Sequence, residues 1–178
     1  MSEYMNNFWL FLNSEEFLNI VLHNRFYLIL LVISLSFVKR HTFQGLFMSS
    51  LVNIPGTVLH ETAHFLVGFI LNAQPASFNL FPKKRDDAYV MGSVGFRNIK
   101  FYNAFPSAMA PLLLLPLAFW FDKYFLITTI WRYLAFVLIE TLIIENAIPS
   151  STDFKVALSS PLGLFFYGGL IFCLAIVM

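Results

Sequence analysis

The hydrophobic residues of this chain fall into five long runs separated by short polar stretches. The runs lie at residues 17–38, 43–71, 104–121, 124–148 and 161–178. A helix needs about 20 mostly apolar residues to cross a bilayer, and most of these runs approach or exceed that length. The pattern predicts an all-α membrane protein with about five transmembrane helices, folded as a single membrane domain over residues 1–178.

The first run carries a polar interruption at His23, Asn24 and Arg25. The apolar stretch after it is short for a span, so two interpretations are open. A surface helix turns into a short span near Arg25, or one tilted helix carries Arg25 near its end. We favour the first interpretation for this N-terminal unit, residues 8–40.

A polar segment at residues 72–103 separates the second and third runs. Ser77–Phe81 and Ala88–Phe96 have the composition of short strands, and Pro82–Asp87 has that of a turn between them. The segment predicts a small β-hairpin between the second and third spans. A plain connecting loop is the alternative.

The composition supports membrane insertion. Hydrophobic residues make up 58% of the chain, charged residues only 12%, and the mean hydropathy is +0.73. A typical soluble domain carries about 25% charged residues. The net charge of +1 provides no basic field for nucleic acid, and the single cysteine, Cys173, excludes an internal disulfide.

The basic residues predict the orientation of these spans. One side of the membrane would hold the larger set, Arg25, Lys83, Lys84, Arg85, Arg97, Lys100 and Lys155, and the other side Lys39, Arg40 and Lys123. Because basic loops stay in the cytoplasm, the first side is predicted to be cytoplasmic. The chain is therefore expected to be an integral, multi-pass membrane protein.

The second run contains the sequence His60-Glu61-Thr62-Ala63-His64. Residues four apart lie on one face of a helix, so His60 and His64 can hold one metal ion, with Glu61 beside it. Two imidazoles suit zinc better than a hard cation, and we expect one Zn²⁺. Ionisable residues are costly inside an apolar span and indicate function there. The alternative is that both histidines only form hydrogen bonds between helices.

A catalytic zinc takes three protein ligands, and the sequence offers three candidates for the third, Asp153, Glu145 and Glu140. Pro149 is expected to end the fourth span and let a polar loop, Pro149–Ser160, fold back to the metal. The predicted topology places this loop and the histidines at the same membrane face, which favours Asp153. The two glutamates remain alternatives.

This set of residues predicts hydrolysis of a peptide bond. Zinc lowers the pKa of its bound water to about 7, and Glu61 can take the proton of that water as it attacks a carbonyl. The predicted function is an intramembrane zinc metalloprotease, a zinc metalloendopeptidase that acts through zinc-bound water activated by Glu61. The alternative is a catalytically inactive membrane protein that keeps the zinc helix for structure or partner binding.

Three stretches together resemble the site-2 protease family of intramembrane zinc metalloproteases. They are the motif at 60–64, Ala110-Pro111-Leu112 in the third run, and Asn146 through Asp153. The resemblance extends over residues 52–155 and implies a three-span catalytic core at about 43–155, with 8–40 and 161–178 as additions. Phe154 and Ala110 stand where the family has glycine, which indicates a divergent, compact member.

The resemblance also implies a role for each site residue. His60, His64 and Asp153 would be the ligands, Glu61 the catalytic base, and Asn146 a residue that holds the substrate backbone. Because a membrane helix satisfies its own backbone groups, the substrate must unwind before it is cut. We expect a membrane-spanning or membrane-bound peptide as substrate, the lipid bilayer as surroundings, no nucleic acid partner, and an active site toward the cytoplasmic side.

Overall fold

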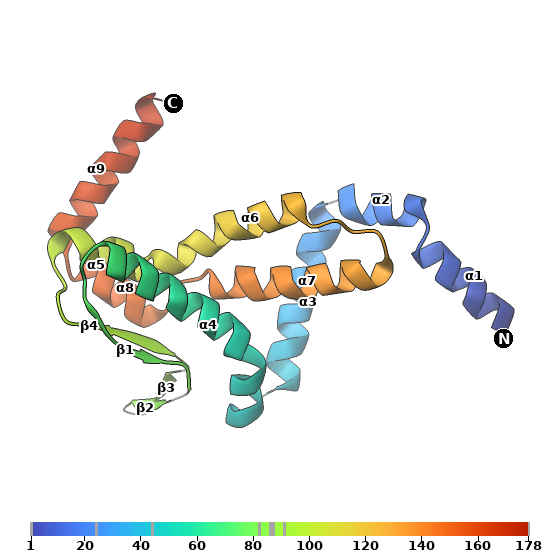
Figure 1. The fold of residues 1–178 in the computed structure, drawn as a ribbon, viewed down its shortest axis with the longest axis horizontal. Helices are drawn as coiled ribbons and strands as arrows, with labels where there is room; N and C mark the ends of the chain where they lie inside the picture. The colour runs from blue at the N-terminus through green and yellow to red at the C-terminus, as the bar shows by residue number, and fades with distance from the viewer. Residues whose placement is uncertain are drawn as a thin grey trace.

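The computed structural model describes residues 2–23, 25–43, 45–81, 83–85, 88–90 and 92–177. These residues are mostly helical, with two short antiparallel strand pairs (Figure 1). The N-terminus and the C-terminus lie at opposite ends of the long molecule (Figure 1). The expectation of a helical protein with a small β-hairpin is confirmed.

Helix α4, Leu46–Ile70, packs against more of the other elements than any other helix does. It agrees closely with the predicted run 43–71, and it continues through Pro55 as one helix. Helices α5 (Phe101–Ala108) and α7 (Ile130–Asn146) pack against it, as does the 3-10 helix η1 (Ala110–Leu113). The paired strands β1 (Pro75–Asn79) and β4 (Ser93–Phe96) lie along the C-terminal half of α4 (Figure 1).

Small side chains allow α5 and η1 to lie close to α4. Ala104, Ala108 and Ala110 are at most 3% exposed, and the ring of Pro111 is also fully buried. Because these side chains end at Cβ or in a compact ring, backbone atoms of neighbouring helices can approach one another. This close packing brings backbone carbonyls within reach of side chains on α4.

The third hydrophobic run is not the continuous helix predicted over Ala104–Phe121. It forms α5, η1 and α6 (Leu114–Tyr124), and α5 is bent by 53° from the segment that follows it. Pro111 lies in the first turn of the 3-10 segment, and α5 ends before it because proline cannot donate the backbone hydrogen bond that would continue the helix. The polar pair Asp122–Lys123, which separates the third and fourth hydrophobic runs, lies within α6, because this helix continues to Tyr124.

The polar loop predicted at Pro149–Ser160 contains a helix, α8, Ser151–Leu158. Ser150 caps it, because the Ser150 hydroxyl accepts a hydrogen bond from the Asp153 N–H and the Asp153 carboxylate accepts one from the Ser150 N–H. This reciprocal pair is a capping box, which stabilises a helix start. Helix α9, Pro161–Val177, follows and packs on α5.

The hairpin consists of two strand pairs. Strand β1 (Pro75–Asn79) pairs with β4 (Ser93–Phe96), and β2 (Lys83–Arg85) pairs with β3 (Ala88–Val90). The predicted turn at 82–87 therefore includes a strand, and its residues Pro82, Asp86 and Asp87 lie outside the described residues. A shift in register near Ser77 accompanies the first pair.

The N-terminal unit contains α1 (Ser2–Leu12), α2 (Glu15–His23) and α3 (Arg25–Thr42). Helices α2 and α3 lie on either side of Asn24, which is itself not described. Helix α3 packs on α7. The start of α7 is held to the N-terminal unit because the Ile130 N–H donates to the Asn13 side-chain oxygen.

Within the described residues, none of the helices alone combines the length and the apolar character needed to cross a bilayer. Two bent pairs do so jointly by length and composition: α5 with the segment 110–124, and α7 with α8, which are bent by 41°.

Candidate metal centre

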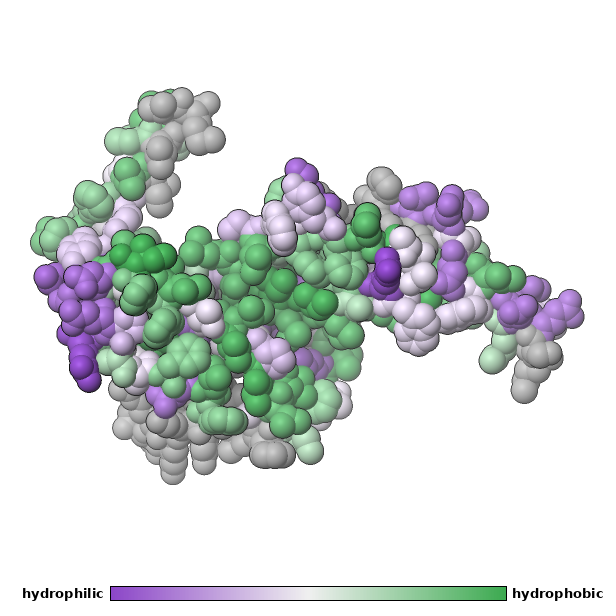
Figure 2. Space-filling model, viewed as in Figure 1, coloured by the Kyte–Doolittle hydropathy of each residue, from purple (hydrophilic) through white to green (hydrophobic). Residues whose placement is uncertain are grey.

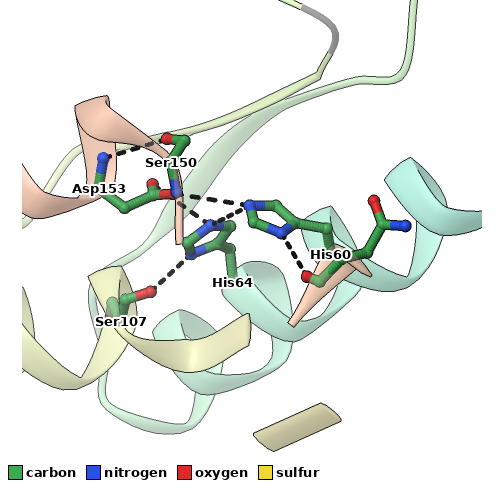
Figure 3. Close-up of polar contacts among 6 residues, drawn as sticks. His60, His64, Ser107, Ser150 and Asp153 are labelled. Atoms are coloured by element: carbon green, nitrogen blue, oxygen red, sulfur yellow. Dashed lines mark hydrogen bonds and ion pairs between the residues drawn. The ribbon is translucent and has the colours of Figure 1, made fainter. Parts of the chain in front are cut away.

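Helices α4 and α8 bring His60, His64 and Asp153 to one point (Figure 3). The two Nε2 atoms of the histidines are 3.2 Å apart. The Asp153 carboxylate oxygens lie 3.5 Å from His60 Nε2 and 3.3 Å from His64 Nε2. All three side chains are largely buried, and the group is close enough to hold one metal ion.

Each imidazole is oriented by a backbone carbonyl. His60 Nδ1 lies 2.8 Å from the Asn146 carbonyl, and His64 Nδ1 lies 2.7 Å from the Ser107 carbonyl. A carbonyl oxygen only accepts, so Nδ1 carries the proton and donates in both rings. Each Nε2 is then left with a lone pair directed at the shared point, the arrangement that ligating histidines use.

Two prolines leave these carbonyls available. In a continuing helix the Ser107 carbonyl would accept from residue 111, which is Pro111 and has no N–H. The Asn146 carbonyl would accept from residue 149 or 150, and Pro149 has no N–H while the Ser150 N–H donates to Asp153 at 2.7 Å. Both carbonyls therefore turn to the histidines instead.

The donor set fits a cation. Two Nε2 lone pairs 3.2 Å apart, with a carboxylate beside them, repel one another unless positive charge lies between them. Ligands of a tetrahedral zinc ion lie about 3.4 Å from each other, given bonds of about 2.0–2.1 Å. The separation of the two Nε2 atoms is close to that spacing, as is the distance from each Nε2 to the carboxylate oxygen that it faces, Oδ2 for His60 and Oδ1 for His64.

The N-terminal turn of α8 fixes the orientation of the Asp153 side chain. Its position as third residue of α8 lets one carboxylate oxygen accept from Ser150 while the other faces His64 (Figure 3). The carboxylate is thereby fixed with its two oxygens facing the Nε2 atoms of His60 and His64.

Glu61 lies beside the histidines on α4 and is 6% exposed. The hairpin passes directly over it at Gly92, where an added Cβ would lie 2.6 Å from a Glu61 carboxylate oxygen and 2.6 Å from the Thr57 methyl group. Only glycine fits this approach without movement of a neighbour. Glu61 is thus enclosed between α4 and the hairpin.

The alternative third ligands lie elsewhere. Glu145 forms an ion pair with Lys39 of α3. Glu140 is buried within α7, and its Oε2 has no hydrogen-bond partner among the described residues. The group that the structure brings together contains Asp153 and neither glutamate.

Asn146 contributes to the centre through its backbone. Its carbonyl orients His60, while its side-chain amide donates to the Leu142 carbonyl and packs against Gly56. The sequence interpretation assigned no role to Ser107 or Ser150. Ser150 is detectable as a capping box with Asp153. Ser107 is detectable only through the proline four residues after it.

Comparison with known proteins adds no identification: no family model, no curated protein and no solved structure matches this chain.

The choice of third ligand can be tested by metal content. We expect Asp153→Ala to weaken zinc binding at least about a hundredfold, because loss of an outer-shell partner alone costs up to that much. Glu145→Ala serves as the control and should bind zinc like wild type. Zinc would be measured by elemental analysis after dialysis against a graded chelator. Equal zinc retention in the two variants would exclude Asp153 as a ligand.

The lack of a backbone N–H at Pro111 predicts a separate effect on zinc binding. Pro111→Ala restores an N–H that competes for the Ser107 carbonyl, so His64 should lose its fixed orientation and zinc affinity should fall about tenfold. Pro116→Ala, at an exposed proline of α6, is the matched control. Zinc dissociation constants of the two variants are compared under conditions in which both have the same thermal stability. An unchanged constant in Pro111→Ala contradicts the mechanism.

Proposed function

We propose that this protein is a zinc metalloprotease of the site-2 protease type, which hydrolyses a peptide bond in or near a membrane-spanning segment. The observation that carries the proposal is the convergence of His60 Nε2, His64 Nε2 and the Asp153 carboxylate, with both Nδ1 atoms fixed by carbonyls. Hydrogen bonding between helices alone would not direct two lone pairs and an anion to one point.

Each residue of the centre would have a separate role in hydrolysis. His60, His64 and Asp153 would hold the zinc, which supplies a lowered water pKa and a positive charge for the developing oxyanion. Glu61 accepts a proton from the attacking water and passes it to the leaving amine. Its enclosure under the hairpin keeps bulk water from the carboxylate, which strengthens its interactions with charged groups.

The surface supports a membrane location for this chemistry. Hydrophobic residues cover the middle of the molecule over α4, α6 and α7, and hydrophilic residues gather near the base of α9 and at the N-terminal end (Figure 2). Exposed examples include Leu115 and Trp120 on α6 and Leu138 on α7. Soluble monomers rarely expose apolar patches this continuous. The bent pairs α5–α6 and α7–α8 would then span jointly with the kinks at the metal.

The hairpin offers a way to hold an unwound substrate. Strands β1 and β4 pair only with each other among the described strands, so each has an outer edge with backbone groups able to pair with an extended peptide. The same hairpin contacts Glu61 through Gly92. A peptide added to this edge would therefore lie next to the catalytic base.

The role of Glu61 separates this proposal from an inactive protein that keeps the zinc helix. We expect Glu61→Gln to retain zinc and to lower the cleavage rate of a membrane peptide by at least about a thousandfold. Glu16→Gln, at an exposed carboxylate of α2, is the control. Cleavage at the wild-type rate in Glu61→Gln would refute the protease mechanism.

Gly92 provides an independent test of the enclosed base. Gly92→Ala adds a Cβ where Glu61 and Thr57 lie, so Glu61 should be displaced and kcat should fall about tenfold or more while zinc content is kept. Gly168→Ala, where an added Cβ meets no atom within 4 Å, is the matched control. Equal kcat values for the two variants would show that the close approach has no effect on catalysis.

A further inference from the structure

We propose that a cavity between α3, α4 and α7 binds the substrate about three residues from the cleaved bond and selects an acidic side chain there through Arg40. The inference rests on the proposed protease function and names the chemistry of its substrate.

The cavity has a volume of about 500 Å³. Its polar lining comes from three helices: Ser36, Lys39 and Arg40 of α3, Ser49 and Asn53 of α4, and Glu145 and Asn146 of α7. A volume in this range is typical of sites for small ligands and short peptide segments. Apolar side chains, among them Val32 and Ile148, complete the walls.

The cavity is adjacent to the metal centre. Asn146 belongs to both, because it lines the cavity and its carbonyl orients His60. Along α4, Asn53 precedes His60 by seven positions, which corresponds to about 10 Å of helix rise. About three extended residues span that distance, so a peptide cut at the metal can place its third neighbouring residue in the cavity.

The charges at the cavity favour an anion. Lys39 and Glu145 form an ion pair with each other, so their charges are compensated. Among the described residues that line the cavity, Arg40 is the charged side chain without such a partner, and it is exposed. One uncompensated guanidinium therefore remains beside the site. A guanidinium binds a carboxylate in a bidentate manner, which gives selectivity for Asp or Glu over a neutral side chain.

The test uses the full-length, zinc-loaded protein in detergent and two sets of peptides. One set varies the third residue before the cleaved bond and the other the third residue after it, and the varied residue is Asp, Asn or Lys. We expect wild type to show a KM about fivefold lower for Asp than for Asn at one of the two positions, with kcat little changed. Arg40→Gln should remove this difference, and Arg40→Glu should favour Lys. Arg132→Gln, at an exposed arginine of α7, should keep the wild-type ratio.

A binding arm separates this inference from the proposed function. Dissociation constants of the same labelled peptides are measured with Glu61→Gln, alone and combined with Arg40→Gln. Binding that favours Asp through Arg40, without cleavage by wild type, supports the cavity and contradicts the protease. Cleavage without any preference for Asp overturns the cavity inference alone. Displacement of the Asp peptide by anionic lipid that itself binds through Arg40 identifies a lipid site and also overturns it.

Discussion

The candidate centre depends on two backbone carbonyls that have lost their helical partners. An imidazole on α4 can rotate, and a fixed hydrogen bond at Nδ1 is what directs Nε2 to the shared point. The Ser107 carbonyl serves this purpose because Pro111 lacks the N–H that would otherwise bind it. The Asn146 carbonyl does so because Pro149 lacks an N–H and the Ser150 N–H donates to Asp153 instead. The bends after α5 and α7 are therefore part of the site, and not only features of packing.

The elements around α4 must also approach it closely to complete the centre. The carbonyl of Ser107 reaches His64 from α5, which contacts α4 and whose Ala104 and Ala108 are buried without a long side chain. The end of α7 reaches His60 because Gly56 leaves room for the Asn146 amide. The hairpin reaches Glu61 because position 92 has no side chain. Each element that contacts the centre therefore approaches at a position where α4 or that element has a small residue.

Much of this arrangement was predictable from the residues. The motif on α4, the extent of that helix and the hairpin follow from periodicity and turn composition, and Pro149 correctly indicates that the chain bends back after α7. The breaks were not predictable from hydropathy, because Ala104–Phe121 is apolar throughout and hydropathy does not register a lost N–H. Helix α8 was missed because it is short and begins with polar residues, although the Ser150–Asp153 capping box marks its start.

In the proposed function, the contact between Gly92 and Glu61 has a consequence for selectivity in a crowded bilayer. With Gly92 against Glu61, the hairpin covers the side of the carboxylate that it faces and presents its own edge next to it. Ordinary neighbouring helices would diffuse past without being cut, because they offer no extended strand that could pair with this edge. Discrimination between substrates and bystanders would then be made before any bond is broken, by the energy needed to unwind the substrate.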